Sequence, residues 1–268
     1  MIDAHVHVWT DDRRRYPRAT GEREYSPARF TPEDLFRHAR PAGITRVVLI
    51  QMSFYRFDNA YMLDMMKAHP GVFSGVGIVD VAGPDPAAAM RALAPQGVRG
   101  FRITAANGLE SPAMRQMWRA AAETGQAMCP LIGPDSLAAI DRMCAAFPDT
   151  NVVIDHLARI GASGTVNDAD VRALCALARR PRVHVKASAF YALGQKKAPY
   201  TDLAPLIRRV FEDFGPRRLM WASDCPFQVE NGHAYQPSLD LIRTGLPFLD
   251  DDAKQWILRR TAEKVFFE

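Results

Sequence analysis

Two histidines near the amino terminus have the spacing of a ligand pair. His5 and His7 alternate with apolar residues in the stretch 2–9, a period-two pattern typical of a β-strand. Positions i and i+2 of a strand project from the same face, so the two imidazoles can converge on one point. Imidazole is the most common metal ligand, but strands also carry hydrogen-bonded structural histidines, and the pair alone favours neither interpretation.

Further polar side chains follow other short apolar runs in the sequence. They are Gln51 after 47–50, Arg102 near the end of 98–103, His156 after 152–154, Lys186 after 183–185 and Asp224 after 219–222. If these runs are parallel strands of one barrel, their carboxyl ends face one site, where these residues and the histidine pair would collect. So many polar groups at the same end of different strands are hard to explain as core filling, and they predict a functional site.

The elements that would position these residues alternate along the whole chain. Eight apolar strands are predicted, at 2–9, 47–50, 73–79, 98–103, 127–132, 152–154, 183–185 and 219–222. Helices that begin at capping pairs such as Thr31-Pro32 and Ser111-Pro112 separate them, and helical segments at 239–246 and 253–265 follow. This order predicts an α/β fold, a single (β/α)8 TIM barrel over residues 1–268 with extra carboxyl-terminal helices. No GxGxxG follows a predicted strand, which argues against dinucleotide binding.

The composition is that of one large globular domain. The chain has 268 residues, of which 48% are hydrophobic, and no linker divides it. Its net charge of +4 comes from scattered arginines, which does not predict nucleic-acid binding but suits a small anionic substrate. The four cysteines are widely spaced, as in a reduced cytoplasmic protein. No leader-like segment or membrane-length apolar run is found, so a cytoplasmic location without membrane contact is expected, and homo-oligomerisation stays open.

Four segments together resemble a known family. They are 3–9 (DAHVHVW), 153–157 (VIDHL), 185–188 (VKAS) and 220–226 (MWASDCP). In this order they resemble the amidohydrolase-2 branch of the amidohydrolase superfamily, and more closely its group of sugar-lactone and 2-pyrone-4,6-dicarboxylate lactonases. The resemblance covers essentially the whole chain. It implies a distorted (β/α)8 barrel with the site at the carboxyl ends of the strands.

The resemblance also implies the metal-binding and catalytic residues. They are His5, His7, His156 and Asp224. In the superfamily these groups hold one or two divalent metals, whereas members of the pyrone-lactonase group work without any. A two-metal centre is not expected, because Arg102 stands where a bridging lysine or glutamate is needed and strand five, at Leu131-Ile132, has no histidine. One divalent ion, zinc or manganese, or no metal at all, is therefore expected.

The expected reaction is hydrolysis of the ester bond in a small lactone that is carboxylated or sugar-derived. Asp224 would take a proton from water as general base. The three histidines would either hold one metal ion that polarises the carbonyl or donate hydrogen bonds to the oxyanion themselves. The resemblance thus predicts a hydrolase that is metal-assisted or metal-independent.

Other residues are expected to contact the substrate or to support the site. Arg102 and Lys186 would pair with a substrate carboxylate, or instead form a salt bridge within the barrel to an acid such as Asp155. Gln51 would contact the substrate or a histidine. Three residues in loops after strands two, seven and eight would line the pocket: Tyr55, Tyr191 and His233.

Two other functions are compatible with the sequence. A mononuclear metal-dependent decarboxylase or C–C hydrolase on the same scaffold would usually carry a histidine on the strand after His156. That strand ends in Lys186, with His184 two residues earlier, which disfavours decarboxylation unless the strand assignment is shifted. A ligand-binding barrel without turnover is the more distant alternative, and the intact set of ionisable groups argues against it.

Overall fold

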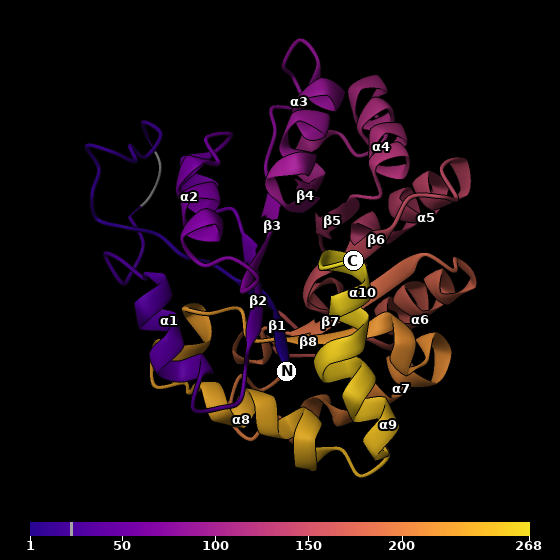
Figure 1. The fold of residues 1–268 in the computed structure, drawn as a ribbon. Coiled ribbons are helices and arrows are strands. Elements are labelled where there is room, and N and C mark those ends of the chain that lie inside the picture. Colours follow the sequence, from indigo (N-terminus) through magenta and orange to yellow (C-terminus); the bar gives the residue numbers. More distant parts are fainter. Residues whose placement is uncertain (22–23) are drawn as a thin grey trace.

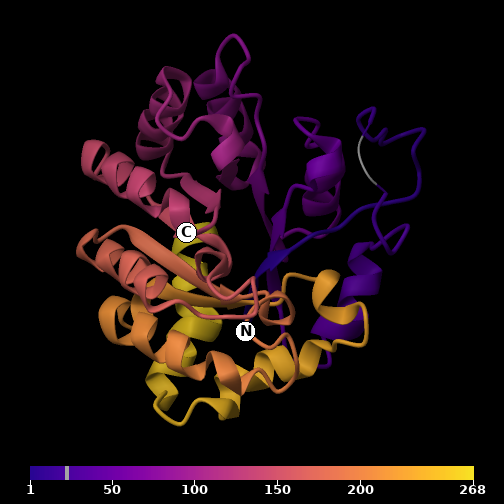
Figure 2. The same cartoon turned by 180° about the vertical axis from the view of Figure 1, so that it is seen from behind.

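Eight parallel strands form a nearly closed barrel in the computed structural model, which describes residues 1–21 and 24–268 (Figures 1 and 2). In chain order they are β1 (Ile2–Val6), β2 (Arg46–Ile50), β3 (Phe73–Gly77), β4 (Val98–Thr104), β5 (Ala127–Leu131), β6 (Val152–Ile154), β7 (Val183–Ser188) and β8 (Leu219–Ala222). Each strand pairs in parallel with the next, and a bridge between Val6 and Cys225 links β1 to the segment just after β8. The predicted (β/α)8 barrel is thereby confirmed.

Helices surround the strands on the outside of the barrel (Figure 1). They are α1 (Pro32–Ala39), α2 (Ala60–Ala68), α3 (Pro86–Leu93), α4 (Pro112–Thr124), α5 (Leu137–Ala146), α6 (Asp168–Ala176), α7 (Ala204–Phe214), α8 (Tyr235–Asp240), α9 (Asp251–Gln255) and α10 (Thr261–Phe266). The predicted caps are present, since the side chains of Thr31 and Ser111 accept from backbone amides in the first turns of α1 and α4. Two π-helical turns, Leu241–Gly245 and Trp256–Arg260, extend α8 and join α9 to α10.

Two apolar layers hold the barrel together and leave one end for the site. Alternate residues of β2 illustrate the division, because Val48 and Ile50 pack inside the barrel while Val47 and Leu49 face the helices. Phe266 of α10 packs into the inner cluster, so this helix covers the amino-terminal ends of the strands. The carboxyl ends of the strands remain for functional side chains.

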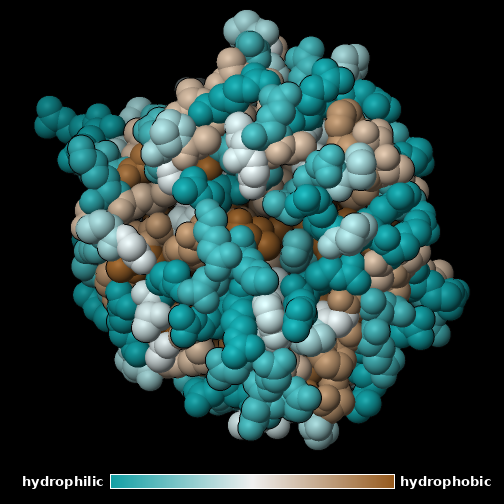
Figure 3. All heavy atoms as spheres, turned by 45° about the vertical axis from the view of Figure 1, so that its right-hand side comes forward, coloured by the Kyte–Doolittle hydropathy of each residue, from teal (hydrophilic) through white to brown (hydrophobic). Residues whose placement is uncertain are grey.

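The surface is mostly hydrophilic in the view of Figure 3, with apolar side chains mainly in recesses. Within residues 1–21 and 24–268, no helix combines the length and apolar character needed to cross a membrane. All four cysteines are free and buried.

Candidate active site

His5, His7 and Asp224 meet at the carboxyl end of the barrel. The Nε2 atoms of the two histidines are 3.3 Å apart, and each lies 3.5 Å from Oδ1 of Asp224. The backbone holds this arrangement, because the amide of Asp224 donates to the carbonyl of His5 and the amide of His7 donates to the carbonyl of Cys225. A change of register between Asp3 and Val6 lets both Ala4 and His5 face the interior. The convergence predicted from the His-x-His spacing is therefore present.

Hydrogen bonds on the outer side of each imidazole fix its tautomer. Nδ1 of His7 lies 3.0 Å from the carbonyl oxygen of Ile50, which can only accept, so Nδ1 carries the proton. Nε2 of His5 lies 2.7 Å from Nη2 of Arg102, which can only donate, so Nε2 of His5 is unprotonated. Nδ1 of His5 lies 3.3 Å from Oδ1 of Asp155 and 3.2 Å from Nζ of Lys186, so a carboxylate and an ammonium both contact this nitrogen. Two nitrogen lone pairs and a carboxylate oxygen therefore point at one another.

A buried ion cluster lies next to these acceptors. Oδ1 of Asp155 lies 3.0 Å from Nζ of Lys186, and Oδ2 lies 3.3 Å from Nη2 of Arg102. Asp155 and Lys186 are both fully buried. Burial alone would raise the pKa of Asp155, but the charges of Lys186, His5 and Arg102 hold this pKa well below its usual value. Asp155 is thus an ionised anchor for His5 and two cations.

His156 reaches the same centre from an unusual turn. Its Nδ1 lies 2.8 Å from Oγ of Ser188, and its Nε2 lies 3.8 Å from Oδ2 of Asp224. His156 opens a run of four residues with positive φ, up to Arg159, in a short turn after β6. Non-glycine residues rarely adopt this conformation in succession, so packing must impose it. The turn places both His156 and Arg159 at the cavity.

Asp224 is buried and is held by donors. The hydroxyl of Tyr191 donates to its Oδ2 at 2.7 Å. Burial by itself would raise the pKa of Asp224, but the neighbouring His156, His7 and His5 outweigh that effect and keep the pKa below its ordinary value. Burial and the Asp224 charge raise the pKa of Tyr191, so its phenol keeps the donated proton. Asp224 is accordingly a carboxylate at neutral pH.

Burial lowers the pKa of all three site histidines. It is the main cause for His5, His7 and His156, and nearby cations add to it. Neutral imidazoles at pH 7 agree with the tautomers given by the hydrogen bonds. The centre therefore presents neutral nitrogen lone pairs and one anionic carboxylate.

A cavity of about 1120 Å³ opens above these groups. His7, Arg102, His156, Tyr191 and Asp224 form its floor and lower wall, and Arg56, Arg159 and Lys196 from three loops contribute positive charge to its lining. Asp224 is the one acidic residue among the described residues that line it. The cavity is suited to a small anion.

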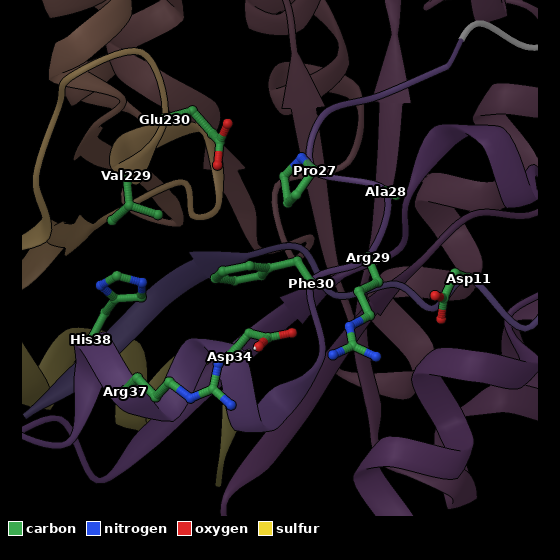
Figure 4. Close-up of a pocket in the computed structure, with 10 residues that line it drawn as sticks. All are labelled: Asp11, Pro27, Ala28, Arg29, Phe30, Asp34, Arg37, His38, Val229 and Glu230. Atoms are coloured by element: carbon green, nitrogen blue, oxygen red, sulfur yellow. Dashed lines mark hydrogen bonds and ion pairs between the residues drawn. The ribbon is translucent and has the colours of Figure 1, made fainter.

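A second, smaller cavity of about 470 Å³ lies between α1, the segment before it and the loop after β8 (Figure 4). Arg29, Asp34 and His38 are among the residues around it, and Ser26 donates to Glu230 across the same loops. It contains no predicted site residue.

The sequence matches a known protein family along almost its whole length. The family model described as Amidohydrolase (Amidohydro_2) matches residues 2–267. The chain belongs to this family.

The amidohydrolase is also similar to individual proteins along most of its length. It is 30% identical to an L-fucono-1,5-lactonase of Burkholderia ambifaria, over 87% of this chain and 82% of that one. It is 26% identical to a 2-pyrone-4,6-dicarboxylate hydrolase of Comamonas testosteroni, over 84% and 76% of the two chains. A crystal structure of a probable 2-pyrone-4,6-dicarboxylic acid hydrolase from Acinetobacter baumannii, with citric acid bound, superposes with a TM-score of 0.85 at 21% identity, covering 100% and 99% of the chains. The amidohydrolase is thus a hydrolase of this family.

Three of the predicted site residues do not line the cavity: Lys186, Gln51 and Tyr55. Lys186 is enclosed beneath the cavity in the salt bridge to Asp155, which is the alternative that the sequence left open. Gln51 is buried, does not line the cavity, and donates to the carbonyl of Asp58 at 2.6 Å. Tyr55 also lies outside the cavity lining and packs against Phe54. Gln51 and Tyr55 therefore shape the loop after β2.

The other predicted residues line the cavity, except His5, which is buried beside His7 and Asp224. Arg102, Tyr191 and His233 line it, although Tyr191 is engaged with Asp224 and His233 with Tyr200. Three cations that line the cavity were not predicted from the sequence: Arg56, Arg159 and Lys196. Only Arg159 had a signal, because it stands three residues after His156.

Proposed function

We propose that this chain hydrolyses the ester bond of a small lactone that carries a carboxylate. The observation that carries this proposal is the buried Asp224 carboxylate, which lies among three neutral histidines at the floor of a cavity with several cations. The relatives named as a fuconolactonase and a pyrone-dicarboxylate hydrolase support lactones as the substrate class. The four free, buried cysteines fit a reducing cytoplasm.

In the proposed reaction, Asp224 removes a proton from a water molecule as its oxygen bonds to the lactone carbonyl carbon. The carbonyl π electrons move to oxygen and form a tetrahedral oxyanion. When the carbonyl re-forms, the bond from carbon to the ring oxygen breaks and that oxygen takes the proton from Asp224. The product is an open hydroxy acid, which releases one proton to solvent near neutral pH.

Arg102 is the proposed donor to the oxyanion. Its guanidinium lines the cavity, and its Nε–H is buried without a partner among the described residues. An unsatisfied buried donor is costly, so a ligand oxygen at this position would be favoured. A cationic donor in a site of low dielectric stabilises developing negative charge strongly. Tyr191 would act by orienting Asp224.

The spacing of three ligand atoms in the centre, taken alone, matches that around a divalent metal, which the family often binds. His5, His7 and Asp224 present their ligand atoms as a triangle with edges of 3.3, 3.5 and 3.5 Å. Tetrahedral bonds of about 2.0–2.1 Å to one zinc ion would give edges of about 3.3–3.4 Å. Zinc or manganese held there, with His156 beside it, would polarise the lactone carbonyl.

The decarboxylase alternative gains no support from the arrangement of β7. His184 stands where the sequence placed it, two residues before Lys186, and donates from Nδ1 to the carbonyl of Arg182 at 3.1 Å. It does not line the cavity. The strand shift that would have restored a second catalytic histidine is therefore not present.

A matched pair of lactones tests the proposal. One carries a ring carboxylate and the other a hydroxymethyl group at the same position, and ring opening is followed by a pH indicator and by NMR. We expect the carboxylated lactone to have the higher kcat/KM. Lys196→Met should raise KM for that substrate and leave KM for the neutral one unchanged. Equal rates for both lactones would refute a carboxylate-selective site, and no ring opening of either would refute the proposed function.

A further inference from the structure

The guanidinium of Arg102 occupies a position that a metal ion would need. Its Nη2 donates at 2.7 Å to Nε2 of His5, the nitrogen that completes the triangle with His7 and Asp224. One lone pair cannot serve a guanidinium and a metal ion at the same time. Any divalent ion bound by His5 must therefore displace this hydrogen bond.

The position of Arg102 is determined by its surroundings. Its strand, β4, turns Phe101 and Ile103 toward the helices, so Arg102 points into the barrel. Asp155 holds the same Nη2 from the other side at 3.3 Å. Only about a tenth of the Arg102 side chain is exposed, 9%. The guanidinium is thus enclosed and has few alternative positions.

The charges of the cluster balance without a metal. Two buried carboxylates, Asp155 and Asp224, lie in one cluster with two enclosed cationic side chains, Arg102 and Lys186. A divalent ion would add two positive charges to a group of buried residues whose charges already cancel. Uncompensated buried charge is strongly unfavourable.

We propose that Arg102 is the resident cation of this site and that it sets a low affinity for divalent metals by occupying the lone pair of His5. The inference rests on the proposed function, because it concerns the same catalytic centre. In the resting site the guanidinium satisfies His5, and its Nε–H is buried without a partner among the described residues. The chain would then polarise its substrate with a side chain where a metal would otherwise do so.

Cobalt(II) titration of the chelator-treated, untagged full-length protein tests this inference. Binding is followed by visible absorption and by calorimetry, with no lactone present. Arg102→Met removes the competing cation and should tighten cobalt binding about tenfold or more, the cost of displacing a charged hydrogen bond. Lys196→Met is the matched control, because it removes one positive charge from the same cavity without touching His5. It should change the affinity only slightly.

Three results would overturn the inference. They are tight stoichiometric cobalt binding by the unaltered protein, no tightening in Arg102→Met, and equal tightening in both variants. If Arg102→Met does not fold, histidine nitrogen NMR of the unaltered protein decides instead. The inference predicts that Nε2 of His5 is unprotonated, accepts a hydrogen bond from Arg102, and loses that bond only when metal is added. A protonated Nε2 would contradict the inference.

The outcomes also separate this inference from the proposed function. If Arg102→Met binds cobalt more tightly but the unaltered protein opens no lactone, only the lactonase proposal is refuted. Lactone opening by a protein whose metal affinity is unmoved by Arg102→Met would refute the inference alone.

Discussion

Replacing Asp224 with asparagine should abolish most of the activity while leaving the fold intact. Tyr191 donates to Oδ2, so the asparagine carbonyl oxygen should take that position and turn the amide nitrogen toward His5 and His7. In the unaltered protein, Oδ1 of Asp224 lies 3.5 Å from the unprotonated Nε2 atoms of both histidines. The asparagine N–H groups in this position would therefore point at hydrogen-bond acceptors. We therefore expect the free energy of unfolding to change by less than about 1 kcal/mol.

The proposed role of Asp224 as general base sets the size of the expected kinetic effect. Proton transfer by a positioned side chain contributes about 10²–10⁴-fold, so kcat for the carboxylated lactone should fall by that factor in Asp224→Asn. KM should stay the same or fall, because the substitution removes a negative charge from a cavity that is proposed to bind an anion. Proton release during ring opening, read with a pH indicator, gives both constants.

Two controls make the result decisive. Mass spectrometry excludes deamidation of the new asparagine back to aspartate, and thermal unfolding confirms the fold. A variant that keeps more than about a tenth of the original kcat, well above the expected loss, would refute Asp224 as the general base.

Three other predictions follow from the same contacts. Tyr191→Phe removes the hydroxyl that donates to Asp224, which should raise the pKa of this carboxyl and shift the acidic limb of the kcat/KM profile to higher pH. An acidic limb at the same pH as in the unaltered protein would contradict the contact. Lys186→Met leaves Asp155 buried with one cation fewer and should lower the free energy of unfolding, measured in urea titrations, by about 3 kcal/mol. Arg13→Met breaks an exposed ion pair and should lower it by less than about 1 kcal/mol. Similar losses in the two variants would contradict the role of Asp155 as a buried anchor. Burial lowers the folded-state pKa of the three site histidines below their unfolded value, so the unfolded chain binds protons first and stability should fall as pH drops below about 6.5. Asp3, whose pKa is raised to about 6, offsets this in part, and urea titrations at pH 7 and pH 5 that show no loss would contradict the neutral histidines.

The barrel could be predicted because the apolar runs and helix caps in the sequence mark the same strands and helices that form the folded barrel. Strand 152–154 and the helix starts at Thr31 and Ser111 follow directly from apolar runs and caps. The convergence of His5 and Asp224 followed from the rule that parallel strands end on one face. Side chains fixed by a strand are thus predictable from spacing.

The remaining details depend on contacts that spacing does not encode. The register change near His5 and the left-handed turn from His156 are backbone states that no residue type there requires. The partners of Arg102 and Lys186 depend on distances across the barrel, so the sequence favoured a substrate contact and left a salt bridge open. The cations contributed by loops, such as Lys196, have no periodic pattern to reveal them.

The most direct test of the account combines metal content with activity. Untagged protein is analysed for metals and assayed on the carboxylated lactone, before and after chelation. We predict that ring opening persists when metal content is far below one ion per chain, because Asp224 and Arg102 supply the base and the cation. Activity that disappears on chelation and returns with one zinc or manganese ion per chain would contradict the role given to Arg102, and no ring opening in either state would contradict the lactonase itself.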